Sequence, residues 1–193
     1  DATVNILKDY MQTGLFSPGD QEFNATASIV LAGNIEVATN DDNPKPSDRY
    51  SHWLAVLPAE VNSDTAFIDR LNAYVPGWEF QKIRKERYAK GYGMMTDYFA
   101  EILKRLRERQ IQTMVAASIN FEGETSRNQD SIQKTTSGLI KLIFPHRDVD
   151  TIEPAEMKMC LELAIETRQI VYDQMAIISP GEYKSRSINV KVK

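Results

Sequence analysis

Arg70 is a permanent cation on a short stretch whose sequence predicts a rigid helix. Ser63 or Asp64 can cap that helix, because a side-chain oxygen there can accept a hydrogen bond from a free N–H group of the first turn. A proline and a glycine at 76–77 then stop the helix at a sharp turn. The guanidinium is therefore either a positive charge held in a fixed place or half of an exposed ion pair with Asp69, which would stabilise the fold only weakly.

Asn34 is a second polar residue with a defined setting, because it follows a continuous apolar run. Residues 28–33 read Ser-Ile-Val-Leu-Ala-Gly and predict a buried strand. An amide at the tip of such a strand can turn or cap the chain. It can also have a catalytic use, since an amide donates and accepts hydrogen bonds at once. The residue type leaves both uses open.

Other reactive groups are scarce in this sequence. It has one cysteine and two histidines, and the histidines, His52 and His146, are far apart in the chain. Cys160 lies among apolar residues at helical spacing, so we expect a buried, inert thiol rather than a nucleophile. No Gly-rich phosphate loop, zinc-type Cys/His spacing or G-x-S-x-G elbow occurs in the 193 residues.

The composition is that of an ordinary globular protein. An apolar fraction of 42% and a charged fraction of 26% are typical, and 193 residues suffice for one domain or two small ones. The net charge of −4 gives no overall attraction to nucleic acid. No apolar run reaches the roughly 18 residues that a membrane span requires, and no signal peptide is visible at Asp1. We therefore expect a cytoplasmic protein without membrane contact.

Although the net charge of the whole chain is slightly negative, positive charge is concentrated in one segment. Residues 82–109 contain nine Lys and Arg against four Asp and Glu. Such a concentration can bind phosphate groups, or it can be the solvated face of a helix, since no aromatic residue is interleaved on the charged side. Met95, Phe99 and Leu103 recur on the other side and predict that this helix packs against a core.

Helices dominate the rest of the chain and define the predicted fold class, which is α+β and mostly helical. Periodic apolar residues predict helices over 3–13, about 130–144 and 154–178. Turn residues at 17–20 predict a β-hairpin, and alternating residues predict strands from Trp78 and over 187–193. Arg168 lies within the apolar stripe of the last helix, which is costly unless it is paired or reaches solvent.

Three stretches of the chain together resemble one protein family. They are Phe-Ile-Asp-Arg-Leu with Pro-Gly-Trp-Glu within 64–80, the apolar run with Gly-Asn at 28–34, and Lys-Thr-Thr-Ser-Gly-Leu-Ile-Lys-Leu-Ile-Phe-Pro-His at 134–146. They are similar to the Lon-related phage-defence ATPases of the BREX type, the BrxL family. That family is an AAA+ ATPase family with a motor similar to that of MCM helicases. The resemblance covers nearly the whole chain.

The resemblance implies a role for three side chains. Arg70 would be the arginine finger that reaches the nucleotide of the next subunit, and Asn34 would be the sensor 1 amide that holds the attacking water near the γ-phosphate. Lys134 falls where MCM-like motors have their sensor 2 arginine, and a cation there can neutralise phosphate charge in the transition state. Lysine lacks the bidentate fork of arginine, and an ordinary surface lysine is the alternative at this position. The family also has arginines in the setting of Arg168, which implies that Arg168 holds a specific acidic partner.

The resemblance also implies what surrounds these residues. Residues 1–90 would be the C-terminal portion of the AAA+ nucleotide-binding subdomain, 91–180 its helical lid, and 181–193 the start of a following strand or linker. The family's Walker A and Walker B segments would precede this chain. We therefore expect ATP and Mg²⁺ to bind only to the intact protein, which would form a homo-oligomeric ring and act on DNA, while the chain alone would be inactive.

Two expectations follow for the N-terminal third. The strand at 28–33 would have two open edges without its neighbours, so we expect it to pair with another copy or this part of the chain to repack. The hairpin tip holds Pro18 and Asp20, neither of which is basic, where the family usually has a basic residue that touches DNA. The residues alone favour a plain surface turn there.

Two other functions remain open at this point. A non-enzymatic helical interaction or nucleic-acid-binding module would use the charges of 82–109. A true ATP-dependent protease would need a nucleophile with its partner base, and this chain holds no such pair. Only a C-terminal region that follows this chain in the family could decide the protease reading.

Overall fold

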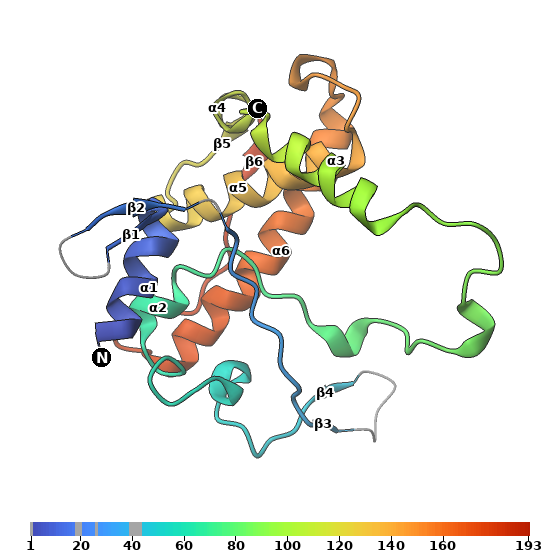
Figure 1. The fold of residues 1–193 in the computed structure, drawn as a ribbon. Helices are drawn as coiled ribbons and strands as arrows, with labels where there is room; N and C mark the ends of the chain where they lie inside the picture. Colours follow the sequence, from blue (N-terminus) through green and yellow to red (C-terminus); the bar gives the residue numbers. More distant parts are fainter. Residues whose placement is uncertain (1, 18–20, 26, 39–43) are drawn as a thin grey trace. The chain divides into compact units, whose positions relative to one another are not determined.

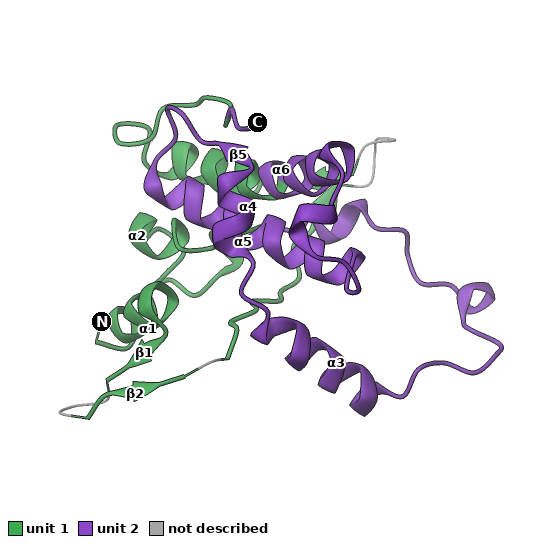
Figure 2. Cartoon of the chain, turned by 90° about the horizontal axis from the view of Figure 1, so that it is seen from above, with its two compact units in different colours: residues 1–74, 167–188 green, residues 75–166, 189–193 purple. Residues whose placement is uncertain are grey.

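The structure is a computed structural model that describes residues 2–17, 21–25, 27–38 and 44–193. It divides into two compact units, residues 1–74 with 167–188 and residues 75–166 with 189–193 (Figure 2). The longest helix, α6 (Pro154–Ile178; Figure 1), begins in the second unit and ends in the first. The fold is α+β and mostly helical, as predicted. The assignment to an AAA+ module and the subdomain boundaries stay predictions.

The first unit begins with the predicted helix and hairpin. Helix α1 (Ala2–Thr13) ends at Gly14, whose φ of 75° is the left-handed conformation that glycine adopts without strain. Strands β1 (Leu15–Phe16) and β2 (Phe23–Asn24) then pair antiparallel, which confirms the hairpin. The tip residues Pro18 and Asp20 lie outside the described residues.

The predicted buried strand at 28–33 does not form. Residues 27–36 have no regular secondary structure, and Ile29, Val30 and Leu31 are 40%, 84% and 49% exposed. A strand of this kind needs ladder partners at its edges and cover on both faces. The described strands of this unit pair with one another instead: β1 with β2, and β3 (Val37–Ala38) with β4 (Lys45–Pro46). Pairing of 28–33 with another copy stays a prediction.

The core of the first unit surrounds a very short helix. The 3₁₀ turn η1 (Trp53–Val56) leads to α2 (Thr65–Ile68), and both Phe67 and Ile68 are buried. The second half of α6 contributes further buried residues to this unit: Arg168, Val171, Tyr172, Gln174 and Met175. Lys8 of α1 forms an ion pair of 2.9 Å with Asp64 at the start of α2. Residues 63–75 thus form one helical turn with anchored ends rather than a longer helix.

The first part of the second unit buries little of its apolar surface. The predicted strand from Trp78 is wrong, because the chain forms the 3₁₀ turns η2 (Gly77–Glu79) and η3 (Lys85–Arg87), and Phe80 and Ile83 are exposed. Helix α3 (Thr96–Glu108) forms, but Phe99 and Leu103 are 47% and 36% exposed. The periodicity correctly placed these side chains on one face. The prediction that this face packs on a core is wrong for the described chain, since periodicity does not supply a packing partner.

The rest of the second unit is a small helical core closed by one strand pair. Its elements are α4 (Gln112–Ala117), β5 (Ile119–Asn120), α5 (Ser126–Ile143), η4 (Val149–Thr151), the first half of α6 and β6 (Lys191–Val192). Strand β6 pairs with β5, in the register Ile119 opposite Val192. Cys160 is 1% exposed, which confirms that the thiol is buried, and burial together with the charge of Glu156 raises its pKa. Among the described residues, no helix is long and apolar enough to cross a membrane.

Candidate functional site

Arg70 lies directly after α2, in a turn that its own helix fixes. Asp64 is the N-cap of α2, and its Oδ1 accepts a hydrogen bond of 2.9 Å from the backbone N–H of Phe67. The backbone N–H of Arg70 donates to the carbonyl of Phe67 at 3.1 Å, and that of Leu71 donates to Ile68 at 2.9 Å. The cap and the two buried apolar residues therefore determine where the Arg70 backbone lies.

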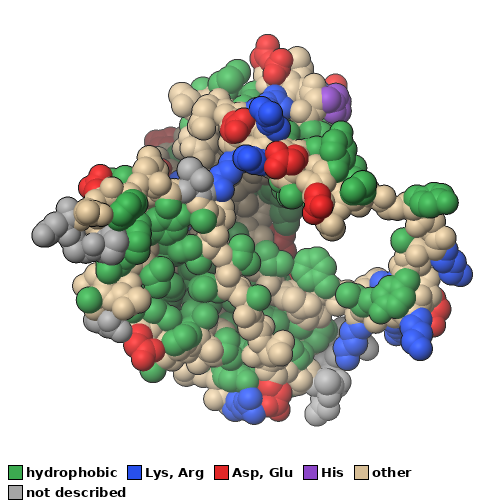
Figure 3. Space-filling model, in the orientation of Figure 1, with side chains coloured by type: hydrophobic (Ala, Val, Ile, Leu, Met, Phe, Trp, Pro, Cys, Tyr) green, Lys and Arg blue, Asp and Glu red, His purple; other side chains and the backbone are tan. Residues whose placement is uncertain are grey.

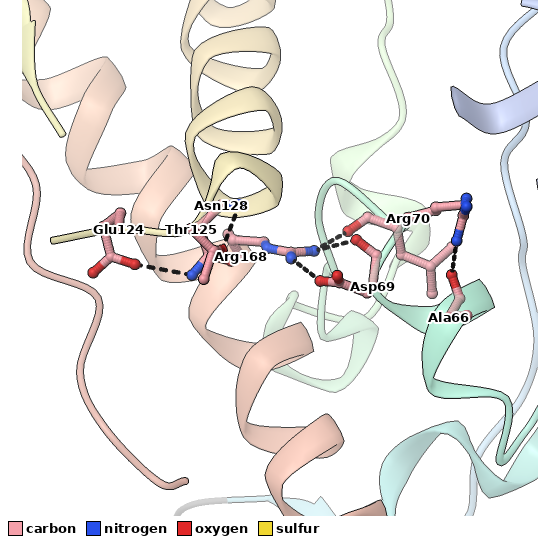
Figure 4. Close-up of polar contacts among 8 residues, drawn as sticks. Ala66, Asp69, Arg70, Glu124, Thr125, Asn128 and Arg168 are labelled. Atoms are coloured by element: carbon pink, nitrogen blue, oxygen red, sulfur yellow. Dashed lines mark hydrogen bonds and ion pairs between the residues drawn. The ribbon is translucent and has the colours of Figure 1, made fainter. Parts of the chain in front are cut away.

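The side chain of Arg70 is half-buried and only partly hydrogen-bonded. Its Nη1 donates to the carbonyl oxygen of Ala66, one turn earlier in the chain (Figure 4). Its Nε is buried and has no hydrogen-bond partner among the described residues. An arginine has five N–H donors in a fixed plane, and a buried donor that is left unpaired costs free energy. The guanidinium is therefore directed by Ala66, and because Nε is buried, an anionic oxygen from outside would meet the outer nitrogens of the guanidinium and not Nε.

Arg168 binds the backbone on both sides of Arg70. It is fully buried, and its Nη1 donates to the carbonyl oxygens of Asp69 at 3.0 Å and Leu71 at 2.8 Å. Its Nη2 donates to the Asp69 carboxylate at 2.5 Å (Figure 4). The expected acidic partner of Arg168 is thus confirmed as Asp69. The alternative in which Asp69 forms its ion pair with Arg70 is not what the structure shows.

The chain that follows Arg70 is tied to α6 by further contacts within the same unit. The backbone N–H of Tyr74 donates to the carbonyl of Thr167 at 3.0 Å, next to Arg168. The rings of Tyr74 and Trp53 lie 6.0 Å apart, and the N–H of Trp53 donates to Oε1 of Gln174 at 2.7 Å. Residues 69–74 are therefore held against the second half of α6 over about one helical turn or more.

Asn34 and Lys134 have more open surroundings than Arg70. Asn34 is exposed within the irregular segment 27–36 of the first unit, and among the described residues no hydrogen bond or ion pair connects it with Arg70. Lys134 is exposed in the first half of α5, in the second unit. Their roles as sensor residues stay predictions, since neither side chain has a structured polar setting that would identify its task.

The second unit contains a buried polar network that sequence reasoning missed. Glu124 is 9% exposed, and its two carboxylate oxygens accept hydrogen bonds from the side chain of Asn128 at 3.0 Å and the backbone of Asn189 at 3.2 Å. Thr125 caps α5 by accepting from the N–H of Asn128 (Figure 4). The sequence did offer a signal for this helix start, because Thr125 stands directly before Ser126 and threonine is a common N-cap residue. The network fixes the start of the helix that carries Lys134.

A second cluster fixes the end of α5. Arg109 donates hydrogen bonds to the carbonyls of Pro145 and Arg147, both at 2.7 Å. The Nη1 of Arg147 in turn donates to both carboxylate oxygens of Glu156, at 2.7 and 2.8 Å. Lys141 donates to the carbonyl of Arg109 at 3.4 Å, and burial together with the charges of Arg109 and Arg107 lowers its pKa. Several basic residues of this region therefore have structural partners.

Comparison with known proteins decides the family. The profile of the family described as "Lon-like protease BrxL-like, ATPase domain" matches residues 1–189. The chain belongs to the BrxL family. It is 35% identical over 181 residues to the Lon-like protease BrxL of Escherichia coli O9:H4 (strain HS), which covers 93% of this chain and 25% of that protein. It is 34% identical to the Lon-like protease BrxL of Bacillus cereus (strain H3081.97), again over 93% of this chain and 26% of the relative.

The extent of the match bears on the candidate residues. This BrxL-family chain spans about a quarter of the length of the curated relatives it matches. Arg70, Asn34 and Lys134 all lie within the residues that match the ATPase-domain profile. The described residues contain no group of three or more His, Cys, Asp and Glu side chains that could hold a metal ion. Of the three candidates, only Arg70 combines a fixed backbone with an unpaired buried donor.

Proposed function

We propose that this chain is part of an oligomeric AAA+ ATPase of the BREX type, and that Arg70 acts on the nucleotide bound by a neighbouring subunit. The observation that carries the proposal is the fixed place of Arg70, whose backbone lies between the two carbonyls held by Arg168 and whose Nη1 is directed by the carbonyl of Ala66. The match to a profile described as an ATPase domain supports the same reading.

The chemistry of phosphoryl transfer requires such a residue. Negative charge on the transferred γ-phosphoryl group must be stabilised in the transition state, and catalysis depends almost entirely on positioning and electrostatics. Arginine suits this task because its planar fork matches two phosphate oxygens and its charge is permanent. When bound, ATP with Mg²⁺ supplies the phosphoryl group that is transferred to water. Arg70 supplies a positive charge from an element that does not need to reorganise.

Asn34 and Lys134 complete the proposed set. The amide of Asn34 would orient the attacking water, since it can donate to one partner and accept from another. The ammonium of Lys134 would reduce phosphate charge as a point charge. Under this proposal residues 1–90 belong to the nucleotide-binding subdomain and 91–180 to the helical lid. The intact protein forms a homo-oligomeric ring that couples ATP hydrolysis to action on DNA.

The experiment is ATP turnover by the full-length protein that contains this chain, comparing wild type with Arg70→Ala and Arg70→Lys. We expect Arg70→Ala to lower kcat by on the order of 10³-fold or more, the range of an arginine finger, with the Kd for ATP unchanged. Arg70→Lys retains the positive charge but not the planar fork, so its kcat should lie between those of wild type and Arg70→Ala. Arg49→Ala is the matched control, because Arg49 forms an exposed pair with Glu36 in the same unit and should leave kcat unchanged.

A second candidate function is favoured by one observation in the segment 80–95. Phe80, Tyr88 and Tyr92 are 65%, 62% and 110% exposed among its basic residues, and in Figure 3 hydrophobic and basic side chains gather together on the loop of the second unit. Exposed aromatic rings beside cations are typical of surfaces that stack nucleic-acid bases. If Arg70→Ala leaves turnover unchanged and only the charges of 82–109 affect DNA binding, the chain is a binding module instead.

A further inference from the structure

Arg168 has an unusual task for a fully buried arginine. Its exposed fraction is 0%, and three of its hydrogen bonds go to two residues 97 and 99 positions earlier in the chain. The acceptors are the carbonyl of Asp69, the carbonyl of Leu71 and the carboxylate of Asp69. These two residues are the immediate neighbours of Arg70. A single guanidinium therefore binds the chain directly before and directly after the candidate finger.

Stability alone is a poor reason for this arrangement. Removing two charges from water is expensive, and apolar side chains of similar volume often hold packed segments equally well or better. One nitrogen, Nη1, that donates to the carbonyls of residues 69 and 71 has another consequence, which is that it restricts the backbone dihedrals of the chain between these two carbonyls, and so of the residue that separates Asp69 from Leu71. Here that residue is Arg70. Its side chain is further directed by the hydrogen bond from Nη1 to the carbonyl of Ala66.

The pairing with Asp69 has a second effect on Arg70. An aspartate next to an arginine in sequence can form an ion pair with it, and such a pair would compete with an incoming phosphate for the guanidinium. The Asp69 carboxylate is instead bound by Arg168 at 2.5 Å and is 17% exposed. Arg168 thus holds the nearest acidic side chain in the sequence in a different ion pair, so the positive charge of Arg70 remains available for an anion.

We propose that Arg168 is a positioning residue for Arg70: it fixes the turn at 69–71 and holds Asp69 away from the Arg70 guanidinium. The proposal rests on the proposed function in that the task of Arg70 is to stabilise phosphate charge. It assigns to α6 a part in catalysis, since a residue in the second half of this helix determines where the finger lies. Arg168 itself does not touch the nucleotide in this account.

The test is a double-mutant cycle on ATP turnover by the full-length protein. Arg168→Lys keeps a positive charge near Asp69 but cannot bind both carbonyls and the carboxylate with one planar group. We expect it to lower kcat by roughly 10- to 100-fold, the effect of a misplacement of about 1 Å, with the Kd for ATP unchanged. In the Arg70→Ala background, Arg168→Lys should cause no further loss, because its effect passes through Arg70.

A matched control separates positioning from general stability. Arg147 also binds a carboxylate, Glu156, and a backbone carbonyl, Thr151, but its contacts do not involve Arg70. Arg147→Lys should lower the temperature of unfolding without changing kcat. If Arg168→Lys does not fold, Asp69→Asn replaces it, since it removes the charge pair and leaves the carbonyl acceptors. We expect Asp69→Asn to lower kcat by a few-fold in wild type, because the weaker hydrogen bond to Arg168 loosens the turn at 69–71, and not at all with Arg70→Ala.

The outcomes distinguish the two proposals. If Arg70→Ala itself leaves kcat unchanged, the proposed function fails. If Arg70→Ala lowers kcat but Arg168→Lys does not, the positioning role is wrong while the finger stands. A loss from Arg168→Lys that persists in full with Arg70→Ala, or an equal loss from Arg147→Lys, would show a structural effect and would also overturn the positioning role.

Discussion

Two charged regions of this molecule, the turn at 69–71 and helix α3, differ in how their charges are bound. In the turn, Arg168 is fully buried and reaches Asp69 at 2.5 Å. In α3, Lys104 and Arg105 form ion pairs with Glu101 and Glu108, both at 3.9 Å and all with more than half of the side chain exposed. Exposed pairs of that length contribute little to stability. The region with fewer charges therefore has the more fixed electrostatic geometry.

The two regions also differ in their apolar side chains. Phe67 and Ile68, beside the turn, are 3% and 0% exposed, whereas Ile83 and Tyr88, in the segment before α3, are 81% and 62% exposed. Burial fixes the backbone of the turn, whereas the backbone hydrogen bonds described for the other segment are the local ones of its 3₁₀ turn, from Arg87 to Arg84 and from Tyr88 to Lys85. The comparison indicates that a site residue is recognised by what holds its backbone and not by the number of charges around it.

The comparison is tested most strongly by truncating one apolar side chain in each region. Ile68→Ala removes a fully buried side chain and should lower the free energy of unfolding by about 2–5 kcal/mol. Ile83→Ala removes an exposed one and should change it by less than about 0.5 kcal/mol. Chemical denaturation of both variants measures the difference. Equal losses would show that the two regions are packed alike and would contradict the comparison.

The cap of α2 gives a smaller effect that is sensitive to acid. Burial opposes ionisation of Asp64, but hydrogen bonds from Lys8 and from the N–H of Phe67, with the charge of Lys8, lower its pKa overall. Asp64→Ala should lower the free energy of unfolding by about 0.5–2 kcal/mol near pH 7. Asp64→Asn should lower it by less, since asparagine also caps helices. The ionised form stabilises the fold, so its contribution is present above the ordinary pKa of 3.8 and lost as the pH falls below it.

Denaturation of these Asp64 variants at pH 7 and in acid provides the measurement. The difference between wild type and Asp64→Ala should shrink in acid. A difference that stays constant down to the lowest pH at which the protein folds would contradict a stabilising carboxylate at this cap.

The smallest expected effect is a pH dependence from His52, which lies just before η1 in the same unit. Burial lowers the pKa of His52, so the folded state favours the neutral ring. The unfolded state binds a proton first as the pH falls through about 6.5, and stability should therefore decline below that value. His52→Gln should remove this decline, whereas His146→Gln should retain it. Unfolding temperatures measured from pH 7.5 to about 5.5 test this prediction. Wild type should lose stability over this range while His52→Gln does not, and a decline of equal size in His52→Gln would contradict the assignment to His52.

The sequence predicted the long helices α1, α5 and α6 well, because their signals are local, whereas the helix expected to continue to the proline and glycine at 76–77 is only the single turn α2. The Asp64 cap, the helix at α1 and the long stripe of α6 each follow from residues within a few turns of one another. The strand at 28–33 was predicted wrongly because an apolar run specifies burial only when strands from elsewhere supply hydrogen bonds. The prediction that α3 packs on a core failed for a related reason. An apolar face shows which side of a helix would be buried, but it does not identify the element that would cover that side.

The candidate site could be predicted in part. Arg70 was singled out by its type and its place before the turn, its role as a finger was implied by the resemblance and stays a prediction, and the position of Arg168 in an apolar stripe indicated that it needed a partner. The identity of that partner could not be read, because Asp69 and Arg168 are 99 residues apart and no local pattern joins them. The roles of Asn34 and Lys134 depend on groups that the described residues do not place beside them, and they stay predictions.

The measurement that tests the central claim most directly is the kcat for ATP hydrolysis by full-length wild type and Arg70→Ala at saturating ATP, with nucleotide binding measured in parallel. The account predicts that turnover falls by on the order of 10³-fold or more while ATP binds with the wild-type Kd. Unchanged turnover in a folded Arg70→Ala protein would contradict it, because the fixed guanidinium at the turn would then have no part in hydrolysis.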